Sequence, residues 1–293
     1  MPAAVVTDTT ASLPGELVDR LGIALVPLYV NFGSERTERE SEITDYRAFF
    51  DELRGAEELP TTSQPSVGDF ASVYEPLLAD GGDVVSIHIS AHLSGTSDAA
   101  RQAAEQLKRE GKGGERVRVI DSESGAGGLG MLVLVCAAAA KAGLALDAIE
   151  ARVNEAHKDL KIWFAVDTLE FLKRGGRIGA ASAWIGSTLK VKPILTMDGG
   201  ELLPVERVRT SSRAFERLVD YARQRHESGA NGWVVQHITA SDQAAQLTDR
   251  CREVFGCDPL FIGELGPVLS IHIGPGMLGV GAVPIRHLDG TTG

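Results

Sequence analysis

The stretch VVSIHISAHLSGTSDAARQAAEQLKR, residues 84–109, contains the pattern that decides the fold. Val84 to Ile89 is a short β-rich run, and Ser97 to Arg109 has the amphipathic spacing of a helix. A polar loop containing Ser94-Gly95-Thr96 joins them. This order of strand, loop and helix is typical of a βαβ unit, in which the helix covers a parallel sheet and returns the chain to the next strand.

The same alternation continues on both sides of this stretch. It predicts a parallel sheet covered on both faces in the first half of the chain. The further strands expected there are Val5 to Thr7, Ala24 to Phe32 and Val117 to Ile120, and the further helices are Asp45 to Arg54, Asp69 to Leu78 (with a capping signal at Ser66) and Met131 to Ala142.

The second half is predicted to form another sheet. Between two of its strands, Asp198-Gly199-Gly200 tolerates positive φ, which predicts a hairpin and a partly antiparallel sheet. The expected strands are Ile162 to Val166, Pro193 to Met197, Glu201 to Val205, Trp233 to Ile238, Leu260 to Gly263 and Val268 to Ile273.

A helix predicted at Asp147 to Lys158 lies between these two groups of strands. At 293 residues the chain is long enough for two cores. We therefore expect an α/β fold of two domains: an N-terminal parallel α/β sandwich, residues 1–158, and a C-terminal mixed or antiparallel α/β domain, residues 159–287.

Composition excludes several classes of function. A net charge of −11 argues against nucleic-acid binding, which needs a concentrated cationic surface. The longest apolar run, Met131 to Ala140, is too short to cross a bilayer, and the N-terminus lacks a secretory signal. The cysteines, Cys136, Cys251 and Cys257, lack the spacing of a zinc site. We expect a soluble cytoplasmic protein with reduced thiols, no metal and no stable membrane insertion.

Hydroxyl-rich segments follow the strands of the first sheet. They are Asp8-Thr9-Thr10, Ser90 with Ser94-Gly95-Thr96, and Asp121-Ser122. In open parallel sheets, ligands bind beyond the carboxyl ends of the strands, so these side chains are candidate ligand contacts. The alternative is that they cap helices, and Ser94 taken alone fits that alternative well.

Two other polar segments are candidates for the same cleft. Thr61 to Ser66 is expected to be a loop, because Pro65 enforces an extended conformation before it; it is either a ligand contact or an ordinary turn. On the strand expected at Val268 to Ile273, a period of two places His272 away from the apolar face, as a ligand contact or as a structural histidine. Gly274-Pro275-Gly276 predicts a tight turn beside it.

Gly125 to Gly130 matches the G-x-G-x-x-G string of dinucleotide-binding proteins. Its context is wrong, because Asp121 to Ser124 separate it from the preceding strand and Asp147 opens a helix instead of ending a strand. We interpret these glycines as allowing a helix start to pack closely. No phosphate-binding loop and no G-x-S-x-G nucleophile elbow occurs, and no cofactor is expected.

Lys173-Arg174-Gly175-Gly176-Arg177 is a cationic cluster in an acidic chain. It fits either an anion or acidic partner, or a helix C-terminus closed by glycine. Arg207 and Arg209 add positive charge near the predicted hairpin.

Taken together and in this order, several segments resemble the DegV family of fatty-acid-binding proteins. They span nearly the whole chain, from Val5 to about Pro284. The segments are residues 6–14 (VTDTTASLP), 62–66 (TSQPS), 93–96 (LSGT), 120–122 (IDS), 167–178 (DTLEFLKRGGRI), 192–195 (KPIL), 209–210 (RT) and 272–276 (HIGPG). Ser97 and Asp98 depart from the family pattern, which commonly has an aromatic residue and an amide there.

The resemblance implies a two-domain protein that buries an acyl chain in a tunnel between its domains. It implies that Thr62 and Ser94 contact the carboxylate and that His272 lies near it. It also implies a separate fatty acid kinase as partner, with Arg174 and Arg177 on the partner-binding surface. We add Arg207 to the predicted partner-binding residues because of its charge near the hairpin.

Two other functions fit the same residues. A serine-dependent acyl hydrolase or transferase would use Ser94 as nucleophile and His272 as base. A lipid-sensing regulatory protein would share every feature of the pocket. The interpretation we adopt is a carrier without catalytic residues that binds a long-chain fatty acid and presents it to the kinase.

Overall fold

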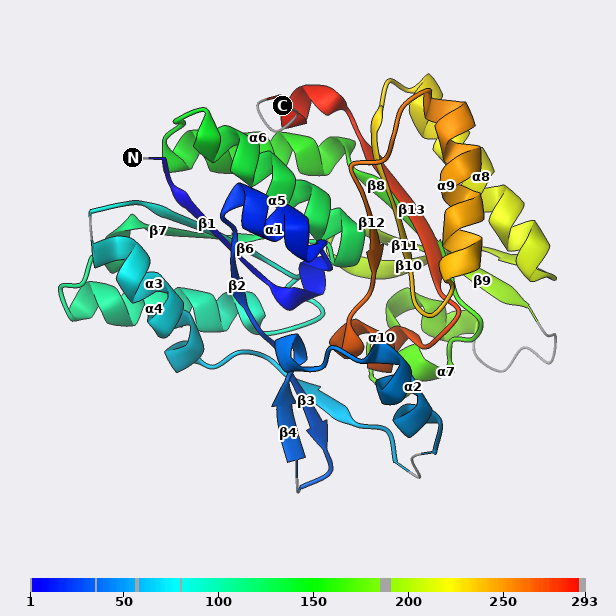
Figure 1. Ribbon diagram of the computed structural model, residues 1–293, viewed down its shortest axis with the longest axis horizontal. Coiled ribbons are helices and arrows are strands. Elements are labelled where there is room, and N and C mark those ends of the chain that lie inside the picture. Colours follow the sequence, from blue (N-terminus) through cyan, green and yellow to red (C-terminus); the bar gives the residue numbers. More distant parts are fainter. Residues whose placement is uncertain (1, 35, 56–57, 80, 185–190, 290–293) are drawn as a thin grey trace.

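The structure is a computed structural model that describes residues 2–34, 36–55, 58–79, 81–184 and 191–289. Two large sheets lie side by side with helices between them, and further helices cover the outer face of each sheet (Figure 1). A small three-stranded sheet extends from one end. The α/β architecture with a parallel first sheet and a mixed second sheet confirms the predicted fold class.

The first sheet is parallel and has the strand order β2-β1-β6-β7. Helices α3 (Val67–Ala79) and α4 (Thr96–Arg109) cover one face, while α1 (Gly15–Leu21), α5 (Ala126–Lys141) and α6 (Leu146–Asp159) lie on the other. The strands are β1 (Ala4–Asp8), β2 (Ala24–Val26), β6 (Val84–His88) and β7 (Val117–Asp121).

Alternation along the strands distributes apolar side chains to both faces of this sheet. Val6 and Val84 pack with Phe70 of α3 under the outer helices, whereas Val5 and Val85 belong to the core around α5. The predicted capping of α3 is confirmed, because Ser66 Oγ accepts a hydrogen bond from Asp69 N and Ser66 N donates to Asp69 Oδ2.

The second sheet has the order β10-β9-β8-β13-β11-β12 and is antiparallel except for the β11–β12 pair. Helices α8 (Ser211–Glu227) and α9 (Ser241–Phe255) cover its outer face. The predicted hairpin at Asp198-Gly199-Gly200 is present, with both glycines at positive φ. The strands are β8 (Lys161–Ala165), β9 (Lys192–Asp198), β10 (Glu201–Val208), β11 (Gly232–His237), β12 (Phe261–Glu264) and β13 (Leu278–Val283).

Helix α5 lies between the two sheets, and every residue from Gly127 to Ala140 is buried. This position explains the apolar run in the sequence, since the helix has core contacts on all sides. At Gly130 a Cβ would lie 2.8 Å from Phe261 Cζ and 2.9 Å from the carbonyl oxygen of Ala11. The glycines therefore allow close packing, as the sequence predicted. Within the described ranges, every helix is too short or too polar to cross a bilayer.

The small sheet is antiparallel, with the order β4-β3-β5. Its strands are β3 (Tyr29–Phe32), β4 (Arg36–Arg39) and β5 (Thr61–Ser63), and η2 (Glu40–Glu42) and α2 (Tyr46–Gly55) connect β4 to β5.

Two predictions in this region are wrong. The single strand expected over Ala24 to Phe32 is two strands in different sheets, separated at Pro27, which has no N–H to donate to a ladder. The loop expected at Thr61 to Ser66 begins instead with β5, which pairs with β3.

The strand predicted at Val268 to Ile273 is also wrong, because these residues form helix α10 (Pro267–Ile273). Pro267 occupies the first turn, where a missing N–H costs nothing, and Gly274 at φ 86° ends the helix. The remaining short elements are α7 (Glu170–Arg174) and the 3₁₀ turns η1 (Thr9–Ala11), η3 (Gly114–Arg116), η4 (Gly179–Trp184) and η5 (Ile285–Leu288).

Candidate functional site

A cavity of about 350 Å³ is enclosed by residues of the second sheet, the start of α5, the loop after β6, strand β5 and helix α10. This volume lies within the range of small-molecule sites in proteins. The loop after β6 lies at the carboxyl ends of the two central strands of the first sheet, β1 and β6. Ligands of open parallel sheets bind at such a position.

Most of the cavity wall is apolar. The apolar side chains come from the second sheet, from α7 and α10, and from the segments that follow β2 and β6, so an elongated apolar ligand would contact carbon atoms from several elements. The apolar lining includes Leu28, Ile89, Leu93, Ile162, Phe164, Leu172, Met197, Leu202, Val234, Val268, Leu269, Ile273, Met277 and Val280.

Polar side chains from three distant segments line the same cavity: Thr62 on β5, Ser94 in the loop after β6, and His272 on α10. Thr62 Oγ1 lies 2.7 Å from His272 Nε2, across 210 residues of sequence. Ser94 Oγ lies 2.8 Å from Thr96 Oγ1. The structure therefore brings the three residues of the predicted carboxylate site to one cavity.

His272 reaches the cavity because α10 is a helix. Val268, Leu269, His272 and Ile273 share one helical face, and all four line the cavity. The strand pattern had placed His272 on the face opposite Ile273, and this placement is wrong.

The imidazole of His272 is neutral at pH 7. Burial, with a smaller contribution from the Arg177 guanidinium, lowers the pKa of His272 to about 4. Its Nδ1 is buried and has no hydrogen-bond partner among the described residues. Gly175 lies so close to this nitrogen that a Cβ there would overlap it.

Ser94 does not cap α4. Gly95 is the N-cap residue and makes no side-chain capping bond, so the capping interpretation of Ser94 is wrong. The hydroxyl of Ser94 bonds to Thr96, while His272 Nε2 bonds to Thr62. A nucleophilic serine and its histidine base would be joined by a hydrogen bond. In the described part of the chain, Ser94 and His272 form no such bond with each other.

The three predicted partner-binding arginines occupy different environments. Arg177 lines the cavity and donates to the carbonyl oxygens of Leu93 (3.3 Å) and Gly175 (2.6 Å). Arg174, at the end of α7, pairs with Glu170 at 3.1 Å. The exposed guanidinium of Arg207 lies over the ring of Trp184, 5.1 Å from its centroid. No local sequence pattern indicated that Arg177 would reach the cavity.

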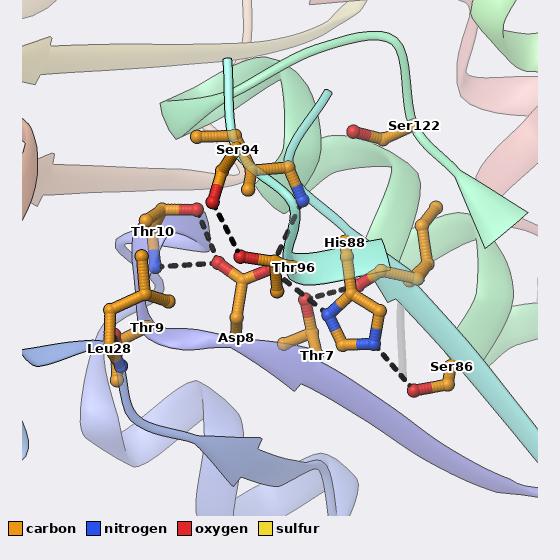
Figure 2. A network of polar contacts seen from close by, with 12 residues as sticks. Thr7, Asp8, Thr9, Thr10, Leu28, Ser86, His88, Ser94, Thr96 and Ser122 are labelled. Carbon is orange, nitrogen blue, oxygen red and sulfur yellow. Dashed lines mark hydrogen bonds and ion pairs between the residues drawn. The ribbon is translucent and has the colours of Figure 1, made fainter. Parts of the chain in front are cut away.

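A buried network beside Ser94 fixes the ends of β1 and β6 (Figure 2). Asp8 accepts hydrogen bonds from the backbone N–H groups of Thr10 and Ile89, each at 3.0 Å, and lies 3.0 Å from His88 Nδ1. His88 Nε2 lies 2.6 Å from Ser86 Oγ. Asp8, His88 and Ser86 are fully buried and are not part of the cavity wall. This series of hydrogen bonds therefore holds the strand ends in place.

The described residues contain no group of three or more His, Cys, Asp or Glu side chains placed to hold a metal ion.

Comparison with protein families gives one match over almost the entire chain. The model described as an uncharacterised protein, DegV family, matches residues 2–285. A DegV domain-containing protein of Streptomyces coelicolor is 41% identical over 279 residues, which cover 94% of this chain and 96% of the relative.

Solved structures give the same result. A DegV family protein from Thermus thermophilus, described by its fatty acid binding, is 36% identical with a TM-score of 0.86 over 97% of this chain and 100% of that one. DegV from Bacillus subtilis, described as a fatty acid binding protein, is 34% identical with a TM-score of 0.84 over 97% of this chain and 99% of that one.

Proposed function

The chain belongs to the DegV family, and from this membership we propose that it binds a long-chain fatty acid in the cavity, with the carboxylate beside Thr62, Ser94 and His272. The observation that carries the proposal is the combination of an apolar cavity with these three side chains on its wall. The fatty-acid binding described for the relatives from Thermus thermophilus and Bacillus subtilis supports it.

The proposed headgroup site suits a carboxylate. An anion that leaves water needs several hydrogen-bond donors, or it takes up a proton. Thr62 and Ser94 each have a hydroxyl donor, and Arg177 lines the same cavity with a full positive charge. The remaining lining polar groups include Ser63 and Gln64 of the same segment as Thr62.

The apolar part of the cavity supplies the affinity in this proposal. Burial of a methylene is worth roughly 0.8 kcal/mol, so a tail of about fifteen methylenes contributes on the order of 12 kcal/mol before ordering costs. A headgroup held by hydroxyls and by Arg177, the one cation among the described lining residues, stays transferable, while the length and shape of the tail determine selectivity.

We also propose that the protein presents the bound acid to a separate fatty acid kinase. A carboxylate oxygen would then be the nucleophile, and this chain would supply positioning, with no catalytic residue of its own. The exposed cations Arg174 and Arg207 support a contact with an acidic surface, because they place positive charge locally on a chain whose net charge is −11.

The binding proposal is tested with a Thr62→Ala, Ser94→Ala double variant. Loss of two donors to a buried carboxylate is expected to weaken binding of a radiolabelled C16 acid at least roughly tenfold, since hydrogen bonds to charged groups contribute about 1.5–3 kcal/mol each. Equilibrium dialysis measures the affinity, and mass spectrometry of lipid released by denaturation identifies the natural ligand.

Ser72→Ala, which removes an exposed hydroxyl on α3, is the matched control and should bind as the wild type does. Equal affinity of the double variant and the control would overturn the carboxylate site.

A further inference from the structure

Glu40 is a buried carboxylic acid outside the proposed headgroup site. It begins η2, directly after β4, and only 4% of its surface is exposed. Acidic side chains are rarely buried to this extent without a specific partner.

The carboxyl group of Glu40 joins two segments of the cavity wall. Its Oε1 accepts a hydrogen bond from the backbone N–H of Val268 at 2.9 Å, at the start of α10. Its Oε2 contacts Thr9 Oγ1, which accepts a hydrogen bond from Leu28 N at 3.2 Å. Val268 and Leu28 both line the cavity.

The approach of Glu40 to α10 depends on Gly266. A Cβ on Gly266 would overlap Glu40 Oε1 and would lie 3.3 Å from the hydroxyl of Tyr46. The other end of α10 is held by the bond between Thr62 and His272. Residues 40 and 62, which flank α2, thus hold α10 at both ends.

The surroundings of Glu40 disfavour its charge. The groups facing it are Asp8 at the end of β1 and Tyr46 of α2, and Tyr46 in turn faces Glu264 of β12; none of them is a cation. Burial raises the pKa of Glu40 to about 7, although hydrogen bonds from Thr9 and Val268 act in the opposite direction.

We infer that Glu40 is a positioning residue of the acid-binding site, because its one carboxyl group fixes the wall segments that carry Leu28 and His272. This inference rests on the proposed function only for the identity of the ligand. The clasp formed by Glu40, Thr9 and Val268 is a property of the unliganded protein.

The clasp should weaken as the pH rises. Exposed Glu has a pKa of 4.5, and the buried group has a pKa of about 7, so the closed clasp binds the additional proton between these values. The contribution of this proton to the stability of the closed clasp is fully present below pH 4.5 and is lost as the pH rises through about 7.

Hydrogen exchange of the Val268 amide measures the clasp without any ligand. After correction for intrinsic exchange, protection of this amide in the wild type is expected to fall by roughly tenfold or more between pH 5 and pH 7. Glu40→Gln keeps a hydrogen-bond acceptor but does not titrate, so its protection should be flat over this range. Amides in α9 serve as the internal control. A Glu40→Gln profile that follows the wild type would overturn the inference.

Binding of the radiolabelled C16 acid provides the second readout. Glu40→Ala is expected to bind at least roughly tenfold more weakly, and Glu40→Gln should recover most of the loss because it restores the acceptor for Val268 N. Glu42→Ala, at an exposed acid of the same 3₁₀ turn, should leave the affinity unchanged.

The outcomes separate the two ideas. If Glu40→Ala binds as tightly as the wild type while the Thr62, Ser94 double variant does not bind, the positioning role is wrong and the proposed function stands. If the wild type binds no fatty acid, the proposed function is wrong, and the site that Glu40 would position is lost with it.

Discussion

The hydrogen bond between Thr62 and His272 determines where the imidazole proton must lie when an acid is bound. Thr62 can donate its hydroxyl proton to a carboxylate only if Oγ1 accepts from His272 Nε2–H. Nδ1 is then unprotonated. The nearby positive charge of Arg177 favours this form, and no acceptor for an Nδ1 proton is present in the described structure. The neutral Nε2–H tautomer is therefore the form that fits the proposed carrier.

Gly175 is predicted to matter through its contact with His272. Its φ of −73° is compatible with any residue, so Gly175→Ala introduces no backbone strain. The new methyl group overlaps His272 Nδ1 and must displace the ring from Thr62. We expect about tenfold weaker binding of the C16 acid, since overpacking costs roughly 1–3 kcal/mol.

Equilibrium dialysis measures this effect of Gly175→Ala. Gly15→Ala is the control, because a Cβ on Gly15 meets nothing within 4 Å. Unaltered binding by Gly175→Ala would show that the position of the His272 ring is unimportant.

The pKa of His272 predicts a dependence of stability on pH. The folded pKa of about 4 lies below the ordinary value of 6.5, so the unfolded state binds the additional proton between these pH values. The stability contribution is present above pH 6.5 and is lost as the pH falls toward 4. With a discount for partial exposure, we expect a loss on the order of 1–2 kcal/mol.

The contribution of His272 is isolated by comparing urea unfolding of the wild type and His272→Gln between pH 7 and pH 4.5. This comparison is necessary because Glu40 acts with the opposite sign in an overlapping range. The difference in unfolding free energy between the two proteins should shrink as the pH falls.

At the scale of elements, the sequence predicted the first sheet well and α10 badly. The strands β1, β6 and β7 are short β-rich runs between turn signals, and local pattern suffices for them. In residues 268–273 a period of two and a helical face both fit the apolar positions, and the run is too short to separate them. Pro267 after Gly266 was the available signal for a helix start.

Three other elements show different limits. β5 is three residues long and exists through its pairing with β3, which is a tertiary contact that local sequence does not specify. Helices α8 and α9 were not predicted, although α8 has a recognisable start, with Thr210 Oγ1 accepting from Arg213 N at 3.1 Å, and a buried face at Ala214, Leu218 and Tyr221. That helix could have been identified from its spacing.

Close packing of α5 predicts the effect of Gly130→Ala. In an exposed helix this change is stabilising by about 0.5–1 kcal/mol. Here the new methyl group would meet Phe261 and the carbonyl oxygen of Ala11 at less than van der Waals distance, so we expect destabilisation of roughly 1–3 kcal/mol instead.

Chemical denaturation measures the effect of Gly130→Ala. Gly68→Ala in α3 is the control, because its new Cβ makes only an ordinary contact of 3.6 Å with Ser66 Oγ. A Gly130→Ala protein as stable as the wild type would show that α5 can shift away from β12 and η1 at no cost.

At the scale of the whole molecule, one core joins the two large sheets. Val85 of the first sheet and Val234 of the second belong to the same buried cluster as Leu132 of α5. The division at residues 158 and 159 remains a prediction; along the chain the strands of the two large sheets fall on either side of it, while α5 contacts both sheets.

The site illustrates the same limit on prediction. Thr62, Ser94 and His272 are far apart in sequence, and they were brought together by resemblance to a family, because local pattern does not report contacts across 210 residues. Glu40 had no signal at all, since one acid among 40 acidic residues is distinguished only by its burial.

The distribution of charge predicts how the proposed contact with a kinase depends on salt. Arg174 and Arg207 are exposed cations on a chain of net charge −11, so association through them should slow as ionic strength rises. Charge reversal, Arg174→Glu with Arg207→Glu, is expected to reduce the rate of kinase-dependent acyl-phosphate formation at least roughly tenfold and to leave binding of the C16 acid unchanged.

Turnover with the cognate kinase at two salt concentrations measures this effect. Arg223→Glu, an exposed single charge reversal on α8, is the control. Turnover of the Arg174, Arg207 variant equal to that of the control would exclude these arginines from the contact.

The central position of α5 has a consequence during synthesis. Residues 1–159 are synthesised before β8, β11 and β13. The side of the apolar helix α5 that packs on the second sheet is therefore exposed while more than a hundred further residues are translated. Until β13 is inserted between β8 and β11, the nascent chain exposes an apolar surface at which it can aggregate or bind a chaperone.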